Sequence, residues 1–235
     1  MNDQPFLFKQ FSIHQDQCAM KVGTDGVLLG AWADGTHACQ ALDIGTGTGL
    51  VALMLAQRFP TLKIDAIELD GDASEQAFAN VSNSKFHRQI AVYHADFMTF
   101  EPSKKYDLIV SNPPFFEDNK KMELNNRKIA RQQQNMSIEQ LIFRAKGMLS
   151  TQGKISLILP YQQLDSVREI AQQHSLYFHK QTNVKGNERT TYKRVLITLG
   201  LHQVAFEEDE LIIEKERHQY TEDYVKLTKD FYLKM

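Results

Sequence analysis

The run Asn112-Pro113-Pro114-Phe115 contains residue types that can act on a flat, nitrogen-bearing group. Its two prolines fix the backbone and remove two N–H donors, so its carbonyl oxygens can accept hydrogen bonds from a ligand. An exocyclic amine is a poor nucleophile while its lone pair is delocalised. If the Asn112 side-chain oxygen and the Pro113 carbonyl accept its two N–H bonds, the lone pair becomes localised without a strong base. Phe115 would stack on the ring, so we expect this run to be catalytic.

A second run, Asp43-Ile44-Gly45-Thr46-Gly47-Thr48-Gly49, lies between a predicted strand and a predicted helix. Glycines at such a turn let a ligand approach backbone N–H groups closely, which is typical of a nucleotide-cofactor site. The spacing alone does not separate a methyl donor from NAD, because dinucleotide-binding domains also carry glycines at this turn. Asp43 would either contact a cationic group of the ligand or brace the turn.

This glycine run resembles the Asp-x-Gly-x-Gly-x-Gly signature of Class I methyltransferases, which use S-adenosylmethionine. The resemblance assigns the cofactor to Asp43, Gly45, Thr46, Gly47 and Gly49, and to Asn112. Glu68 lies roughly 20 residues beyond the glycines, where a carboxylate can accept bonds from ribose hydroxyls, with Asp70 as the fallback. Asp96 resembles the family position that binds the adenine amino group, with Phe97 beside it. A helix N-cap and an ordinary core aromatic are the structural alternatives for these two.

Strands and helices alternate around these residues. Strands are expected at 41–44, 63–69, 90–94, 106–111, 154–160, 177–184 and 194–201, and helices at 50–58, 73–83, 137–149 and 164–174. Ser137 and Gln140 have the spacing of a capping box. The alternation predicts an α/β, Rossmann-like, doubly wound fold with a mostly parallel seven-stranded sheet that ends in an antiparallel hairpin. The carboxyl ends of its strands would bring the candidate residues together.

Three segments are expected along the chain. Residues 1–38 form a short extension, with an extended segment or hairpin near Phe6 to His14 and a short helix capped by Thr24 and Asp25. Residues 39–202 form the catalytic domain. Residues 203–235 form an acidic and amphipathic tail, in which a docked helix would present an apolar face. That face would comprise Tyr220, Tyr224, Leu227 and Phe231.

The block from Met20 to Trp32 (MKVGTDGVLLGAW) resembles the N-terminal block of the bacterial tRNA1(Val) adenine N6-methyltransferase family. The resemblance implies a tRNA partner, with methylation of the adenine beside the anticodon. It also places Lys21, Thr24 and Asp25 near the methionine end of the cofactor, with helix capping as the alternative for the last two. An anticodon-loop adenine is cheaply unstacked, which favours RNA over duplex DNA.

Two basic segments are candidate RNA contacts. The polar stretch 116–136 carries Lys120, Lys121, Arg127, Lys128 and Arg131. A second patch combines Lys185, Arg189, Lys193 and Arg194, with Tyr177 and Tyr192 interleaved. A solvated loop of mixed charge is the alternative for the first segment, since it also contains acidic residues.

Three other functions remain open from the sequence. The same four-residue motif serves enzymes that methylate a glutamine amide of peptide release factors, because an amide nitrogen poses the same lone-pair problem. A non-catalytic RNA-binding module could keep the fold, but the intact Asn112 and glycine run argue against it. An NAD-dependent oxidoreductase would not explain the Asn-Pro-Pro-Phe motif.

Bulk composition fits a globular protein. Of 235 residues, 42% are hydrophobic and 24% are charged, and the formal charge is -2. No apolar run approaches the roughly 20 residues that cross a bilayer, so a cytoplasmic protein is expected. Cys18 and Cys39 are too few for a disulfide framework and lack metal-ligand spacing, so no metal is expected.

Overall fold

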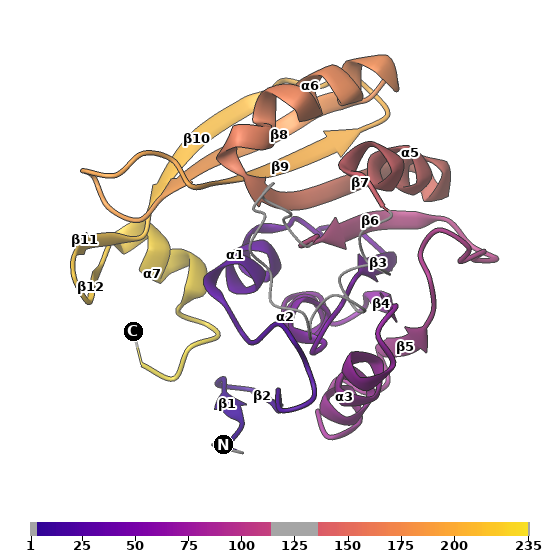
Figure 1. The fold of residues 1–235 in the computed structure, drawn as a ribbon, viewed down its shortest axis with the longest axis vertical. Helices are drawn as coiled ribbons and strands as arrows, with labels where there is room; N and C mark the ends of the chain where they lie inside the picture. The colour runs from indigo at the N-terminus through magenta and orange to yellow at the C-terminus, as the bar shows by residue number, and fades with distance from the viewer. Residues whose placement is uncertain (1–3, 114–135, 235) are drawn as a thin grey trace, which may run out of the picture.

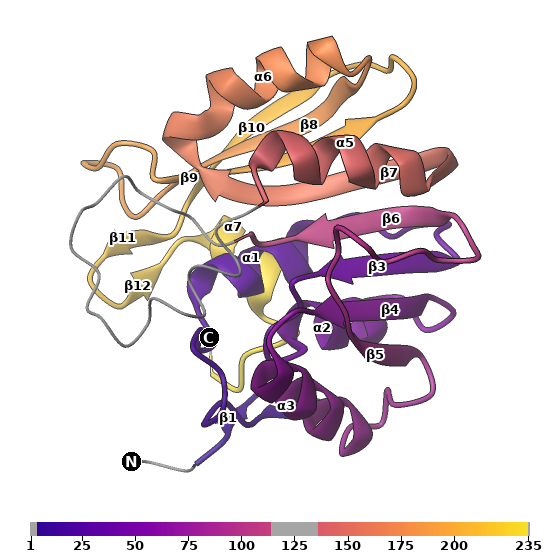
Figure 2. The same cartoon turned by 45° about the vertical axis from the view of Figure 1, so that its right-hand side comes forward.

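The computed structural model describes residues 4–113 and 136–234, and its centre is an eight-stranded sheet (Figures 1 and 2). The order across the sheet is β10-β8-β9-β7-β6-β3-β4-β5. The strands are β3 (Gln40–Ile44), β4 (Lys63–Glu68), β5 (Ile90–His94), β6 (Tyr106–Ser111), β7 (Leu149–Pro160), β8 (Tyr177–Lys185), β9 (Arg194–Gly200) and β10 (Glu207–Ile212). Within this sheet of the described chain, β9 alone runs antiparallel to its neighbours.

Helices cover both faces of the sheet, as Figure 1 shows. On one face lie α1 (Thr24–Trp32), α2 (Leu50–Arg58), α3 (Gly71–Ser82) and α7 (Glu222–Thr228), and on the other lie α5 (Ile138–Met148) and α6 (Leu164–Gln173), the last preceded by the 3-10 turn η1 (Tyr161–Gln163). Successive strand residues alternate between the two layers. Leu108 and Val110 pack with α1 and α2, whereas Ile109 packs with α5 and α6. This alternation explains why the central strands are apolar at nearly every position.

The predicted doubly wound α/β fold is confirmed, with one difference in the sheet. The seven expected strands are present, and the expected antiparallel pair is β8 with β9. The count of seven is wrong because the tail adds β10, which pairs with β8 from Glu207↔Lys180 to Ile212↔Lys185. Four consecutive acidic residues in Glu207–Ile212 concealed this strand, since charged residues are unusual in strands. At an exposed edge they remain solvated, and they face basic and polar side chains of β8.

Local sequence signals set several element ends. Ser137 and Gln140 form the predicted capping box at the start of α5, with reciprocal bonds of 3.1 and 2.8 Å. Strand β7 begins at Leu149, earlier than expected, because α5 ends at Met148 and the chain extends at once. The capping of α1 by Thr24 and Asp25 was predicted wrongly. Its N-cap is Gly23, and both residues lie inside the first turn.

The two ends of the chain pack into the same apolar layer as α1 and α2. Strands β1 (Phe6–Leu7) and β2 (Ser12–Ile13) form a small hairpin, and a second one joins β11 (Glu214–Glu216) to β12 (Gln219–Tyr220). The rings of Phe8 and Tyr232 lie 5.8 Å apart, while Tyr224 and Phe231 are buried in that layer. The predicted tail helix is therefore present as α7, but it is shorter than expected. Of the four residues of the predicted apolar face, Tyr220 precedes α7 and Phe231 follows it. The three-segment division of the chain stays a prediction.

None of the helices in residues 4–113 and 136–234 has the length and apolar character needed to cross a membrane.

Candidate functional site

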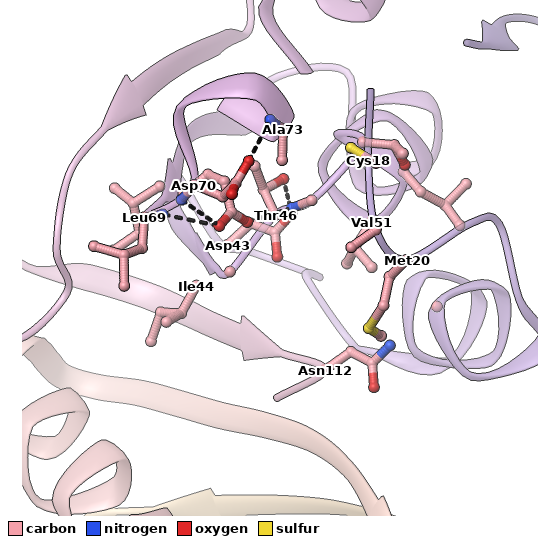
Figure 3. Close-up of a pocket in the computed structure, with 18 of the residues that line it drawn as sticks. Cys18, Met20, Asp43, Ile44, Thr46, Val51, Leu69, Asp70, Ala73 and Asn112 are labelled. Carbon is pink, nitrogen blue, oxygen red and sulfur yellow. Dashed lines mark hydrogen bonds between the residues drawn. The ribbon is translucent and has the colours of Figure 1, made fainter. Parts of the chain in front are cut away.

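A pocket of about 510 Å³ lies at the carboxyl edge of the sheet (Figure 3). Its walls come from the segments that follow β3, β4, β5 and β6, together with residues 14–23, which we call the N-terminal strap, and the start of α1. Open parallel sheets bind ligands at this edge, because the strands end there and the loops diverge. The fold thus gathers residues that are far apart in sequence.

The glycine run forms the turn between β3 and α2. Gly45, Gly47 and Gly49 have φ angles of +68°, +56° and +84°, a region that other residues rarely occupy. A Cβ on Gly45 or Gly47 would meet nothing within 4 Å, so these positions require glycine for their conformation and leave the pocket side open. Main-chain N–H groups of Gly45 and Thr46 donate to the Ile67 carbonyl oxygen at 2.9 and 3.0 Å. The turn is thereby fixed to the end of β4.

Asp43 braces this turn from beneath. Its Oδ2 accepts bonds from the Thr46 hydroxyl at 2.6 Å and from the Ala52 N–H at 3.2 Å. The side chain lines the pocket but is only 1% exposed. Burial raises its pKa from 3.8 to about 7, against the lowering effect of these two bonds, and the Glu68 carboxylate raises it further. A cation arriving in the pocket would favour the ionised form, so Asp43 is suited to an ammonium group.

Glu68, at the end of β4, is also buried and lines the pocket. Its Oε2 accepts from the Gly47 N–H at 2.9 Å, and its Oε1 accepts from the N–H groups of Leu69 and Asp70 at 2.9 and 3.0 Å. Each carboxylate oxygen can accept more than one bond, so Glu68 can hold the loop and bind a hydroxyl as well. Asp70 caps α3 through the Ala73 N–H, which gives it a structural task of its own.

Asp96 and Phe97 follow β5 and both line the pocket. The Asp96 side chain accepts from the Met98 N–H at 2.8 Å within a tight turn, and no helix starts there in the described chain. Phe97 is buried among α5 and α6 residues, and its carbonyl oxygen accepts from Arg144 Nε at 2.6 Å. Phe97 is thus a core residue whose ring also borders the pocket.

Asn112 follows β6 and reaches the pocket from the side opposite Asp43 and Asp70, as Figure 3 shows. Its Oδ1 is buried and has no hydrogen-bond partner among the residues that the structure describes. The preceding Ser111 donates to the Ile44 carbonyl oxygen at 2.9 Å, which holds the ends of β6 and β3 together. Pro113 is half-buried beside it. Pro114 and Phe115 lie outside the described residues.

The N-terminal strap closes one side of the pocket. Buried Asn80 on α3 holds it: its Oδ1 accepts from the His14 N–H, and its Nδ2 donates to the carbonyl oxygens of His14 and Thr48, all at 2.9 Å. Exposed Lys21 on the strap and Thr24 in α1 line the pocket, as the family resemblance implies. Asn80 was not predicted. Its signal is a polar residue within the apolar face of a helix.

Asp25, on the first turn of α1, also lines the pocket and accepts from Arg194 Nε at 2.7 Å. The register Pro160↔Arg194 places this end of β9 at the same sheet edge as the pocket. Lys185 pairs with Glu210 at 3.0 Å, whereas Arg189 and Lys193 are exposed. These basic residues therefore lie on the pocket's edge of the sheet, although acidic partners offset two of them.

Of the two aromatic residues expected in that basic patch, one is misplaced. Tyr192 lies 4.9 Å from the Tyr161 ring and beneath Lys185, as predicted for the patch. Tyr177 begins β8, and the strand carries it to the opposite end from Lys185. Its inclusion in the patch was wrong, because nine strand residues span about 26 Å. Lys120, Lys121, Arg127, Lys128 and Arg131 lie outside the described residues.

The further strap residues that line the pocket were not predicted, and they include Cys18 and Met20. Cys18 is buried, and burial together with the nearby Glu68 and Asp70 carboxylates raises its thiol pKa to about 12. It therefore remains a neutral thiol in the pocket wall. Their only sequence signal was their position at the edge of the Met20 to Trp32 block.

Comparison with known proteins identifies the family of the chain. Residues 27–183 match the family model described as the methyltransferase small domain. A protein of Christiangramia forsetii is 46% identical, with 100% of both chains covered, and one of Flavobacterium psychrophilum is 48% identical, with 98% of this chain and 100% of that protein covered. Both are named tRNA1(Val) (adenine(37)-N6)-methyltransferase.

Solved structures of low identity share the fold. A predicted O-methyltransferase from Agrobacterium tumefaciens superposes with a TM-score of 0.68 at 20% identity, covering 88% of this chain and 96% of that chain. A glycopeptide N-methyltransferase in complex with S-adenosyl-L-methionine gives 0.54 at 13% identity, covering 78% of this chain and 90% of that chain. The chain therefore belongs to the methyltransferase small domain family and, within it, to the family of proteins named tRNA1(Val) (adenine(37)-N6)-methyltransferase.

Proposed function

We propose that this protein transfers a methyl group from S-adenosylmethionine to the exocyclic N6 nitrogen of adenine 37 in tRNA1(Val). The observation that carries the proposal is the buried Asn112 Oδ1, which has no partner in the described chain and lines the pocket beside the glycine turn. A buried acceptor without a donor is costly, and for Asn112, which lines the pocket, a bound ligand can supply the donor. The names of the full-length relatives supply the identity of the acceptor.

The pocket fits S-adenosylmethionine by its donor set. Open glycine positions before α2 let a carboxylate approach the positive N-terminal end of that helix, and buried Asp43 suits an ammonium. Glu68 and Asp96 supply oxygens for ribose hydroxyls and the adenine amino group, and Phe97 supplies an apolar border. The strap and the first turn of α1 would contribute further cofactor contacts, from Lys21, Thr24 and Asp25. When bound, the cofactor supplies an electrophilic methyl on a sulfonium.

Asn112 would orient the acceptor rather than remove its proton. The N6 amine of adenine is conjugated with the ring, and its lone pair becomes available when both N–H bonds are directed to fixed oxygens. Asn112 Oδ1 and the Pro113 carbonyl oxygen are the oxygens that we assign to this task. Ser111, tied to Ile44, fixes their position at the end of β6. Fixed acceptors in a site shielded from water contribute most of such a rate enhancement.

The RNA would approach across the sheet edge that carries the pocket. Exposed Arg189 and Lys193 can contact phosphates there, with Lys185, Arg194 and Tyr192 nearby. We also retain the proposal that the basic residues of 116–136 contact RNA, and that Pro114 and Phe115 complete the catalytic motif.

Incubation with tritiated S-adenosylmethionine and unmodified tRNA tests this function. The expected product is N6-methyladenosine in tRNA, seen by mass spectrometry of digested nucleosides. Asn112→Ala should abolish it while leaving cofactor affinity, measured by calorimetry, within about 3-fold, since the other proposed cofactor contacts, at the glycine turn, Glu68 and Asp96, remain. Gln40→Ala is the matched control, because Gln40 also has a buried, unpartnered Oε1 but lies outside the pocket, and its activity should match the wild type.

Other outcomes would redirect the assignment. Label in a peptide release factor instead of RNA would place the chemistry on a glutamine amide. RNA binding without any methyl transfer would leave a non-catalytic binding module, and NAD binding in place of S-adenosylmethionine would indicate an oxidoreductase.

A further inference from the structure

A methionine side chain stands exposed in the pocket. Met20, on the N-terminal strap, is 53% exposed and lines the pocket. Among the large apolar side chains exposed in residues 4–113 and 136–234, it alone lines this pocket. Side chains of this kind are usually buried, and one that faces solvent inside a binding pocket is available for ligand contact.

The position of Met20 separates it from the part of the pocket assigned to the cofactor. In Figure 3 the side chain extends from the strap toward Asn112, whereas Asp43, Thr46 and Asp70 gather on another side of the pocket. Of these, Asp43 and Thr46 are buried, at 1% and 6% exposed. A macromolecular substrate must enter from solvent, so the exposed side of the pocket near Asn112 is the side at which it would arrive.

The strap holds Met20 in place rather than leaving it on a loose end. On one side of it the Gln17 N–H donates to Gln76 Oε1 at 2.8 Å, and on the other the Val22 N–H donates to Gln15 Oε1 at 2.7 Å. Asn80 fixes the start of the same segment at His14. The strap is thus tied to α3 on the N-terminal side of Met20, and the bond between Val22 and Gln15 closes the strap on itself around Met20. The unbranched side chain remains adaptable.

We propose that Met20 forms the apolar wall against which the methyl-accepting adenine lies, a role that rests on the proposed function. A purine presents its polar groups at its edge and an apolar π surface on its faces. Asn112 would bind the edge through the amine, which leaves a face to be covered by an apolar group. A thioether packs well on such a surface, because sulfur makes favourable contacts with aromatic rings. Met20 is therefore a positioning residue for the base.

A binding cycle with two RNAs tests this role. Affinity is measured by fluorescence anisotropy for tRNA1(Val) with adenine at position 37 and for the same tRNA with an abasic site there, in the presence of S-adenosylhomocysteine so that no transfer occurs. Met20→Ala should weaken binding of the adenine-containing tRNA about 3- to 10-fold, from the loss of one thioether–aromatic contact. It should leave the abasic tRNA unchanged. Calorimetry should show unchanged affinity for S-adenosylmethionine.

Two variants control the measurement. Met20→Leu preserves apolar volume and should bind both RNAs within about 2-fold of the wild type. Leu7→Ala removes an equally exposed apolar side chain, at 54%, that does not line the pocket, and it should bind as the wild type does.

Each contrary result has a distinct meaning. Equal weakening of both RNAs by Met20→Ala would overturn the contact with the base and assign Met20 to the RNA backbone or to the strap. Weakened S-adenosylmethionine binding would move Met20 to the cofactor. If Met20→Ala binds both RNAs normally while the wild type methylates tRNA, only the role of Met20 fails. If the wild type methylates no tRNA, the proposed function fails and the role of Met20 with it.

Discussion

Replacing Asp43 by asparagine should stabilise the protein in a pH-dependent way and weaken cofactor binding. Asp43 Oδ2 accepts both the Thr46 hydroxyl and the Ala52 N–H, so the asparagine oxygen can keep both bonds while the buried charge is removed. The wild-type carboxyl is fully buried, and its pKa is raised from 3.8 to about 7, mainly by desolvation. Because a tenfold change in proton affinity equals about 1.4 kcal/mol, this rise corresponds to about 4 kcal/mol.

The sign of the effect follows from proton binding. Between the unfolded pKa of 3.8 and the folded pKa of about 7, the folded state holds a proton that the unfolded chain has released. The free energy of unfolding of the wild type therefore falls as pH rises through this window. Above pH 7 the Asp43 carboxyl causes no further change. Asparagine does not titrate, so the advantage of Asp43→Asn should open between pH 4 and pH 7 and reach at most about 4 kcal/mol above pH 7.

Urea unfolding at pH 4, 5.5, 7 and 8.5 measures this difference. Asp65→Asn is the matched control, because Asp65 is also buried but has Lys104 at 2.9 Å and the Tyr106 hydroxyl at 2.7 Å. Asp65→Asn should lose stability, because it removes the charge that pairs with Lys104. Calorimetry should show that Asp43→Asn binds S-adenosylmethionine more weakly, since the charge that faces the ammonium is gone. An Asp43→Asn advantage that stays constant from pH 4 to 8.5 would refute the reasoning.

Three further changes have defined outcomes. Asn80→Ala removes three hydrogen bonds to the strap and the glycine turn, so it should lower the free energy of unfolding by about 1–3 kcal/mol. It should also weaken cofactor affinity, and unchanged affinity would mean that the strap is not needed to form the pocket. Iodoacetamide at pH 8 should label exposed Cys39 well before buried Cys18, because the thiol pKa of Cys18 is about 12. Peptide mapping measures the two labelling rates, and equal rates would contradict the buried position of Cys18. Replacing Arg189 and Lys193 together by alanine should reduce the salt dependence of tRNA binding by a slope of roughly 1–2, and an unchanged slope would place the phosphates elsewhere.

Much of the fold was predictable because its signals are local and repeated. Apolar runs of strand length alternate with helical segments, and the Ser137–Gln140 capping box marks the start of α5. The edge strand β10 was not predictable from its composition. Its acidic residues disfavour a strand when considered alone, and only the pairing with β8 makes a strand of them.

The candidate site was predictable where a motif fixes both chemistry and backbone, as at the glycine turn and Asn112. The contributions of Met20 and Cys18 from the strap were not, because these residues acquire their position only when the strap is tied to α3. Arg194 illustrates the same limit: its charge suggested RNA, but the register of β9 brings it to Asp25 at the pocket. Tertiary contacts of this kind leave no signal in local spacing.

The most direct test of the account is the position and chemistry of the methyl group. Unmodified tRNA1(Val) is incubated with S-adenosylmethionine and either the wild type or Asn112→Ala, cut into fragments, and read by mass spectrometry. We expect one added methyl on N6 of adenine 37 with the wild type and none with Asn112→Ala, although both bind the cofactor. A methyl on another atom or nucleotide, or full methylation by Asn112→Ala, would contradict it.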